Sequence, residues 1–598
     1  MAERKNLILI IILIFIGFFI YTFNLNNPLF WDDDEWIKGN IFVHSLSYLK
    51  EIFTQNVEAG FGLSSNYYRP FLLLSFAFNY LIHGIQPFGY HLVSNGFHIA
   101  NGILIFILLT KFLSFRASFI ASLLFLIHPA QTEAVSYISG RGDPMSVFFI
   151  LSALWLFIKF LNPVRGREGP QRISASNGVN IKISKSRNVF LSLSFVSMFF
   201  AVLSRETAIL FPLFLMIFYI SFFTKEKFVP ALKKSFIISF PFWFISVVYL
   251  ILRLTVFNFQ NTLNFYTQSN IYSENLFYRL FTFGAVLIEY FKIIFWPLGL
   301  HMERDFPIFI SLFHWPVWLG VIAVLSILYL VFRFYHKEKI WFFSWSWFFV
   351  ALAPVSGIIP INAFIYEHWL YAPLIGFATF AGFYIDRLLY FLKSKNYSVY
   401  YFLFTIFLTV CFSFFAVQTI RRNILWGNPV RFYEDILKYS PSSVRIMTNL
   451  ANLYSARGDL VRAEDLFKKA IESEDGSIFA QPYYNLGNLY RDTGRIDEAI
   501  EQYKKAIETD PNFPFAYQNL AVLLINKKQD LVSGIEILEK LKEVQPGNPR
   551  VYYNLGLLYL ATNNPELAVQ NLELGFNFAK GRDSETEKAI AEVLSKIK

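Results

Sequence analysis

Long apolar runs separated by short polar segments fill residues 1–420, whereas residues 440–598 read as soluble helical sequence. A helix that crosses a bilayer needs about 20 mostly apolar residues, and fewer where neighbouring helices shield it. We therefore expect an all-α protein in which a polytopic helical bundle precedes a soluble domain. About eleven runs qualify as spans, at residues 7–23, 91–113, 116–128, 144–161, 189–203, 207–223, 236–256, 315–335, 341–354, 369–390 and 398–419.

Two further runs, 70–84 and 279–297, are apolar but more amphipathic. If neither crosses, the basic residues between the spans all fall on one face, which the positive-inside rule makes cytoplasmic. We therefore predict that both runs lie in the outer interface or re-enter from it. The basic residues concerned are Arg4, Lys5, Lys111, Arg116, Arg165, Arg167, Arg172, Lys182, Lys185 and Arg187, and those within 225–234, 333–339 and 387–395.

Residues 449–576 repeat themselves at a spacing of about 35 residues. "NLANLYSARGDLVRAEDLFKKAI" (449–471) matches "NLGNLYRDTGRIDEAIEQYKKAI" (485–507), and two more copies begin at 519 and 554. Small residues recur where paired helices approach closely, and the pattern is that of tetratricopeptide repeats. These small residues are Ala451, Gly487, Ala521 and Gly556. We expect about four repeats and a terminal helix, stacked into an α-solenoid that binds an extended segment of another chain.

One asparagine recurs at the same helical position of every repeat. These side chains either hydrogen-bond a peptide backbone in the groove or serve the stack itself. We take them as the candidate acceptor- or partner-binding residues: Asn449, Asn485, Asn519 and Asn554.

Charge and cysteine content narrow the function further. The net charge of +10 comes from Lys and Arg placed between apolar runs, so we do not expect a nucleic-acid partner. The single cysteine, Cys411, lies inside an apolar run, which excludes intrachain disulfides. The basic N-terminus leads into a long apolar stretch without a small-residue cleavage site, so we expect an uncleaved first span with a cytoplasmic N-terminus.

The segment "LFWDDDEWIKGN" (29–40) places four acids directly after the first span, at the outer face. Three more polar patches reach the same face: 129–143, the "SRET" turn at 204–207, and "NAFIYEHW" at 362–369. Ionisable groups at such depths are costly. Each patch alone is equally consistent with snorkelling or a structural ion pair, but their convergence favours a functional site.

Sugar nucleotides are generally absent outside the cytoplasm, so an enzyme of this face takes sugar from a polyprenyl-phosphate carrier. Its chemistry needs a carboxylate base for the acceptor hydroxyl and a cation or hydrogen-bond donors for the departing phosphate. It also needs an apolar groove for the tail, which the runs 70–84 and 279–297 suit. Candidates for receiving the phosphate are Arg69, Arg141, Arg205 and His368.

The acidic segment resembles the Asp-Asp-x-x-x-Ile/Val-x-x-Asn stretch of the transmembrane-and-TPR O-mannosyltransferases and their bacterial relatives, in the GT-C glycosyltransferase superfamily. Ile37 and Asn40 fit this pattern, which makes Asp32 and Asp33 the acid pair. The resemblance covers nearly the whole chain, repeats included. One departure is His368, because the family usually has an arginine after the acid that precedes it. Further similar stretches are 67–98, 128–143, "SRET", 367–377 and 418–426.

The resemblance implies an integral membrane glycosyltransferase that moves a monosaccharide, with inversion, from a polyprenyl phosphate to a hydroxyl of a protein acceptor. It implies that Asp32 is the catalytic base and that Asp33 orients it or binds the acceptor. A divalent cation stays open. The spacing of His83, His91 and His98 suggests a metal site, but their spread over a re-entrant helix and the next span, without a nearby cysteine or a carboxylate at ligand spacing, argues against one. The residues expected at the donor are Arg69, Glu133, Arg141, Asp143, Arg205, Glu206, Glu367 and His368.

We thus expect a membrane glycosyltransferase domain at 1–425, a linker at 426–444 and a repeat domain at 445–598. Its expected location is a bacterial cytoplasmic membrane, with the catalytic loop and the repeats outside; the endoplasmic reticulum is the alternative. Two other functions stay open. One is a non-catalytic scaffold that organises an envelope complex through its repeats, and the other is the same chemistry on a lipid or polysaccharide acceptor.

Overall fold

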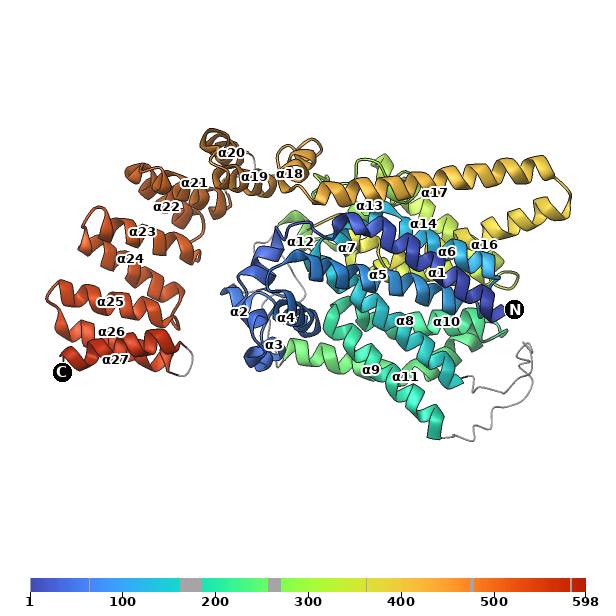
Figure 1. The fold of residues 1–598 in the computed structure, drawn as a ribbon, viewed down its shortest axis with the longest axis horizontal. Helices are drawn as coiled ribbons and strands as arrows, with labels where there is room; N and C mark the ends of the chain where they lie inside the picture. Colours follow the sequence, from blue (N-terminus) through green and yellow to red (C-terminus); the bar gives the residue numbers. More distant parts are fainter. Residues whose placement is uncertain are drawn as a thin grey trace. The chain divides into compact units, whose positions relative to one another are not determined.

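The computed structural model describes residues 2–63, 65–161, 185–255, 270–361, 363–473, 478–580 and 583–597. The chain forms two compact units, Met1–Pro429 and Val430–Lys598 (Figure 1). Of the basic residues used above to orient the chain, Arg165, Arg167, Arg172 and Lys182 lie outside the described residues, as do the side chains of Arg4, Lys5, Lys185 and Arg187.

Seven helices in the described part of the first unit are long and apolar enough to cross a membrane, which makes the chain a multi-pass membrane protein. The other four expected spans form shorter apolar helices, α6 (Phe115–Ile127), α9 (Lys185–Ser204), α10 (Phe211–Phe222) and α15 (Ile340–Leu352). The total of eleven spans therefore stays a prediction. The seven long helices are α1 (Ala2–Tyr21), α5 (Pro87–Leu109), α8 (Gly142–Leu161), α11 (Phe228–Leu254), α14 (Trp315–Phe334), α16 (Pro373–Ser394) and α17 (Ser398–Trp426).

The two amphipathic runs form α4 (Pro70–His83) and α13 (Leu276–Phe295). Neither is among the seven long spans. In α13, the charged residues Arg279, Glu289 and Lys292 interrupt the apolar sequence. Whether these helices lie in the outer interface stays a prediction.

Glycines allow several helices of the bundle to touch backbone to backbone. A Cβ on Gly320 of α14 would stand 1.9 Å from the carbonyl oxygen of Gly284 in α13. On α16, a Cβ on Gly376 would meet Ser344 O at 2.3 Å, and one on Gly382 would meet Ala117 O at 2.5 Å. Close approach through small residues is how helices associate in lipid, where apolar side chains alone give little preference for protein over lipid.

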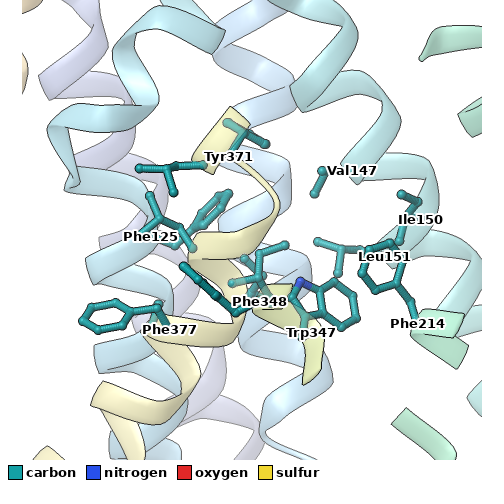
Figure 2. Packing of buried hydrophobic residues seen from close by; sticks show 14 of the residues in the cluster. Phe125, Val147, Ile150, Leu151, Phe214, Trp347, Phe348, Tyr371 and Phe377 are labelled. Carbon is teal, nitrogen blue, oxygen red and sulfur yellow. The ribbon is translucent and has the colours of Figure 1, made fainter. Parts of the chain in front are cut away.

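Large aromatic and branched side chains fill the space between these helices. Figure 2 shows Trp347 and Phe348 of α15 lying among Phe125, Leu151 and Phe214, which come from three other helices. The ring centroids of Trp347 and Phe214 are 4.3 Å apart. This core fixes the bundle below the polar segments that carry the candidate site.

A seam of amides and hydroxyls joins the ends of four elements. Asn24, after α1, and Asn95 of α5 donate to each other at 3.0 and 2.8 Å. Asn24 also donates to Ser136 Oγ, at the end of α7 (Thr132–Ser136). Ser136 donates to Asn423 of α17, which in turn donates to the carbonyl of Ile20. All these side chains are buried, and we call Asn24, Asn95, Ser136 and Asn423 the amide seam.

The second unit is a stack of antiparallel helix pairs that follows α18 (Pro429–Leu437). Gly487 packs against the ring of Tyr503, and Gly556 packs against Leu572, so the repeated small residues do lie where paired helices meet. The pairs are α19 (Val444–Ala456) with α20 (Leu460–Glu472), α21 (Ala480–Asp492) with α22 (Ile496–Thr509), α23 (Pro514–Asn526) with α24 (Leu531–Val544), and α25 (Pro549–Ala561) with α26 (Pro565–Ala579), before the terminal α27 (Ser584–Ile597).

Candidate active site

The acidic segment has an unusual backbone. Trp31, directly before the acid pair, has a φ of 65°, a left-handed conformation that a bulky side chain rarely adopts. Asp34–Lys38 then forms a single π-helical turn, a rare element that is frequent at functional sites. Asp34 points outward, where it pairs with Lys38 at 2.6 Å. Because of this backbone conformation, consecutive acidic side chains of the segment lie in different environments.

Asp33 is fixed inside the protein and only 2% exposed. Its Oδ1 accepts hydrogen bonds from Ser139 N at 2.8 Å and Ser139 Oγ at 2.6 Å, and its Oδ2 accepts a longer one from Phe30 N. The ring of Trp426 packs against the rings of Phe30 and Tyr137, and the ring centroids are 5.6 Å apart in both pairs. Asp33 therefore ties the segment after α1 to the segment between α7 and α8.

Two residues of the sequence motif have local structural roles. Ile37 is fully buried in a small core with α4. Asn40 accepts from Phe42 N, which caps α2 (Ile41–His44), and it donates to Val57 O at 2.8 Å. A Cβ on Gly60 would collide with the Asn40 amide. The motif thus holds the segment around residue 58 against the acid pair.

This contact adds an acid that sequence reasoning missed. Glu58 accepts from Trp36 Nε1 at 3.2 Å, and the charge of Asp32 acts on it and on Glu35. Burial, with this repulsion from Asp32, raises the pKa values of Glu35 and Glu58 to about 7. Burial also raises the pKa of Asp33 to about 7, against the lowering effect of its hydrogen bonds. We call Asp32, Asp33, Glu35 and Glu58 the acid cluster.

Buried ion pairs adjoin the acid cluster. Arg69 lies over the ring of Tyr67, with its Cζ 4.5 Å from the centroid, and donates through Nε to Glu206 at 3.1 Å. Arg253 also approaches Glu206, at 3.7 Å. Arg205 pairs with Asp143, which also feels the charge of Arg69. The "SRET" turn and the second outer loop therefore meet beside the acidic segment.

His368 and Glu133 form a close contact between the second loop and the 362–369 segment. Their Nδ1 and Oε1 atoms are 2.5 Å apart, and Glu133 Oε2 accepts from Glu367 N at 2.8 Å. Burial lowers the pKa of His368 to about 3 and raises the pKa of Glu133 to about 7. His368 is therefore neutral at physiological pH, and it cannot supply the positive charge that an arginine would.

Two arginines beyond the predicted set bind the neighbouring carboxylate. Glu367 is fully buried and accepts from Arg422 Nη2 at 2.9 Å and Arg304 Nη2 at 3.3 Å. Arg422 also donates through Nη1 to Leu300 O. The "QTIRRNILW" stretch contained Arg422, but nothing in the sequence around Arg304 showed that it would meet residue 367.

Arg141 differs from the other predicted arginines. It is fully buried. Its guanidinium donates to Ser94 Oγ, Asn79 Oδ1, Ser75 Oγ and Tyr90 O, at 2.7–3.1 Å. Its donors are thus occupied by protein acceptors on α4 and α5, so this side chain anchors the second loop rather than facing a ligand.

The structure therefore brings most of the predicted site residues into one charged network that runs from Asp32 to His368. The charge of Asp32 acts on Tyr67, Arg69 acts on Asp143, and Asp143 acts on His368. Arg141 also feels the charge of Asp33, but its hydrogen bonds go to acceptors of α4 and α5 rather than to members of this network. Two of the three histidines with metal-like spacing have other partners, since His91 bonds Asn27 O, and His98 bonds Tyr371 OH and Leu126 O.

The four repeat asparagines have different environments. Asn519 donates a hydrogen bond to Asn488 Oδ1 at 2.8 Å, so this side chain links helices within the stack. Asn485 is buried and accepts from Gln481, whereas Asn449 is half-buried and Asn554 is exposed. A uniform asparagine ladder along one groove is thus absent from the described repeats.

Comparisons with known proteins support both units. Tetratricopeptide family models match residues 444–473 and 549–579, and a TPR-repeat model matches residues 487–527. Part of this chain is also similar to the solved structure of MamA, at 24% identity over 26% of this chain and 88% of that chain, with a TM-score of 0.23. Another is YrrB, described as a TPR protein with an unusual peptide-binding site, at 21% identity over 30% of this chain and 86% of that chain, with a TM-score of 0.23.

The curated relatives of this chain include a group of enzymes, and one of these matches is long enough to extend beyond the repeat unit. The protein O-mannosyl-transferase F38B6.6 of Caenorhabditis elegans is 25% identical over 480 residues, which are 77% of this chain and 62% of that protein. The mouse protein O-mannosyl-transferase TMTC3 is 36% identical over 137 residues, which are 22% of this chain and 15% of that protein. The chain thus spans less than two thirds of these relatives. This chain is therefore similar to the TMTC-type protein O-mannosyl-transferases and carries tetratricopeptide repeats.

Proposed function

We propose that this protein is a glycosyltransferase that transfers a monosaccharide from a polyprenyl-phosphate donor to a hydroxyl of a protein acceptor, on the extracytoplasmic face of its membrane. The homology to protein O-mannosyl-transferases supports the reaction class. The proposal rests on one observation, that the acid cluster lies beside buried arginines. Together these groups offer a base and positive charge within one network.

Asp32 is the base in this mechanism. It is half-buried, whereas Asp33 is enclosed and held by Ser139. The Asp32 carboxylate takes the proton of the acceptor hydroxyl as that oxygen attacks the anomeric carbon. The bond from this carbon to the phosphate oxygen breaks, and the polyprenyl phosphate leaves with the electron pair. Attack opposite the leaving group inverts the anomeric configuration.

The remaining residues hold the reactants. Asp33 orients the acid segment, while Arg69 and Arg205 bind the donor. Asp143, Glu206 and Glu133 hold these cations and His368 in place, and Glu367 fixes the last loop. His368 acts as a neutral hydrogen-bonding group. The repeats present the acceptor or a partner, with Asn449 and Asn554 the asparagines most open to one.

The test is sugar transfer by the purified full-length protein with a polyprenyl-phosphate sugar and an acceptor peptide. Asp32→Asn removes the base but keeps the shape, so we expect transfer to fall about 100-fold or more. Asp34→Asn is the matched control, because its exposed side chain pairs only with Lys38 among the contacts described, and should transfer at the wild-type rate. Undiminished transfer by Asp32→Asn would reject this mechanism.

A further inference from the structure

Arg304 and Arg422 share one carboxylate. Both guanidinium groups contact Glu367, which is completely enclosed, while the side chains of Arg304 and Arg422 are 12% and 8% exposed. Glu133 lies next to them, but its oxygens accept from Glu367 N and contact His368. Both arginines thus face Glu367, and their charges also act on the neighbouring Glu133.

Both arginines also have unused donors. Within the described residues, the buried Nε of Arg304 and that of Arg422 have no hydrogen-bond partner. Buried hydrogen-bond donors in proteins nearly always have an acceptor, so an unpaired donor of this kind indicates that a ligand supplies the acceptor. Arg304 donates a hydrogen bond to Glu367 only through Nη2, so most of the N–H groups of its guanidinium have no described acceptor. Guanidinium forks bind phosphate oxygens with strong, charge-assisted hydrogen bonds.

An exposed apolar stretch begins at Ile308, shortly after Arg304 in the sequence. Ile308, Ile310 and Leu312 are exposed, and Phe313 is 95% exposed. The stretch is tied to α13 by the hydrogen bond from Phe309 N to Thr282 Oγ1, at 3.0 Å. A phosphate that carries a long hydrocarbon chain fits a cationic pair flanked in this way, because the chain covers the apolar side chains while the head group meets the arginines.

We propose that Arg304 and Arg422 bind the phosphate of the polyprenyl-phosphate carrier and retain it as the leaving group. This inference rests on the proposed function, and it assigns to these two arginines the task for which the sequence offered Arg69, Arg141, Arg205 and His368. The sugar then lies toward Asp143 and Arg205, since His368 and Glu133 connect the two places.

The experiment measures binding of a sugar-free polyprenyl phosphate to the full-length protein in lipid nanodiscs. We expect Arg304→Gln to weaken binding about 10-fold to 100-fold, the effect of losing a charged hydrogen bond. Arg304→Lys should lose less, because it keeps the charge without the fork. Lys292→Gln is the matched control, since it removes an exposed cation of α13 and should bind like the wild type.

Two ligand controls identify the source of the phosphate. The corresponding polyprenol should bind equally weakly to the wild type and to Arg304→Gln. Inorganic phosphate should compete only at far higher concentration than the lipid; equal potency would overturn the lipid assignment. Wild-type affinity in Arg304→Gln, with the thermal unfolding midpoint unchanged, would overturn the inference. That outcome leaves the proposed function standing, because Asp32→Asn tests catalysis and should still bind the sugar-free carrier.

Discussion

Four carboxyl groups in the acid cluster repel one another within a partly buried space. Glu58 is the member that the chain brings from farthest away, through the contact of Asn40 with Val57. Its pKa is raised from 4.5 to about 7, so the folded state holds more protons than the unfolded state between these values. Stability must therefore fall as the pH rises through this window and stay level above it.

Glu58→Gln removes one ionisation and keeps an acceptor for Trp36. We expect the variant to match the wild type near pH 4.5 and to be more stable than it above pH 7, as measured by thermal unfolding across this range. Glu226→Gln, which removes an exposed carboxylate elsewhere in the same unit, should show no such gain. An equal gain at pH 4.5 and pH 8 would contradict the assigned titration.

At the same scale, the sequence offered Asp32, Arg69, Asp143 and Arg205 as candidates because ionisable residues beside spans are conspicuous. It did not separate the enclosed Asp33 from the more open Asp32, since that difference arises from Ser139, 106 residues away. Arg304 was missed for a similar reason, as its partner Glu367 is 63 residues distant. Residue types are visible in a sequence, whereas long-range pairings are not.

Among the helices, the tightest contact is between α13 and α14. Gly284 and Gly320 meet backbone to backbone, and a carbonyl group cannot rotate away as a side chain can. α13 also holds the stretch that carries Phe309, through Thr282. A change in the α13–α14 distance should therefore affect both stability and the outer loops.

Gly320→Ala should destabilise the protein by about 1–3 kcal/mol, the usual result of overpacking. Gly96→Ala is the control, since a Cβ there meets nothing within 4 Å, and alanine favours a helix. Thermal unfolding of both variants in detergent gives the comparison. Equal midpoints for Gly320→Ala and the wild type would mean that the two helices separate freely.

The helices themselves were largely readable from the sequence. Apolar length predicted α1, α5, α14 and α17, and the 35-residue period predicted the repeats. Periodicity does not predict the contacts of Asn519. This side chain binds Asn488 within the stack, although it occupies the same repeat position as Asn554. Equivalent positions in a repeat need not have equivalent neighbours.

For the whole molecule, the central question is which compartment each unit occupies. The sorting of basic residues predicts that Asp32 and residues 430–598 are both extracytoplasmic. A reporter that is active only outside the cytoplasm, fused after residue 430, should therefore be active, and one fused within 225–234 should be inactive. If the fusion within 225–234 were active and the fusion after residue 430 inactive, the predicted orientation would be wrong. The base, the donor and the acceptor could then not share the extracytoplasmic compartment.

The amide seam contains no ionisable side chain. Its hydrogen bonds connect the ends of the first and last long helices with α5 and α7. Acidification and added salt, which loosen ionic contacts, leave amide and hydroxyl bonds intact. The scaffold beneath the reaction centre should accordingly keep its shape in compartments of very different acidity, so that only the charged groups above it respond to the surroundings.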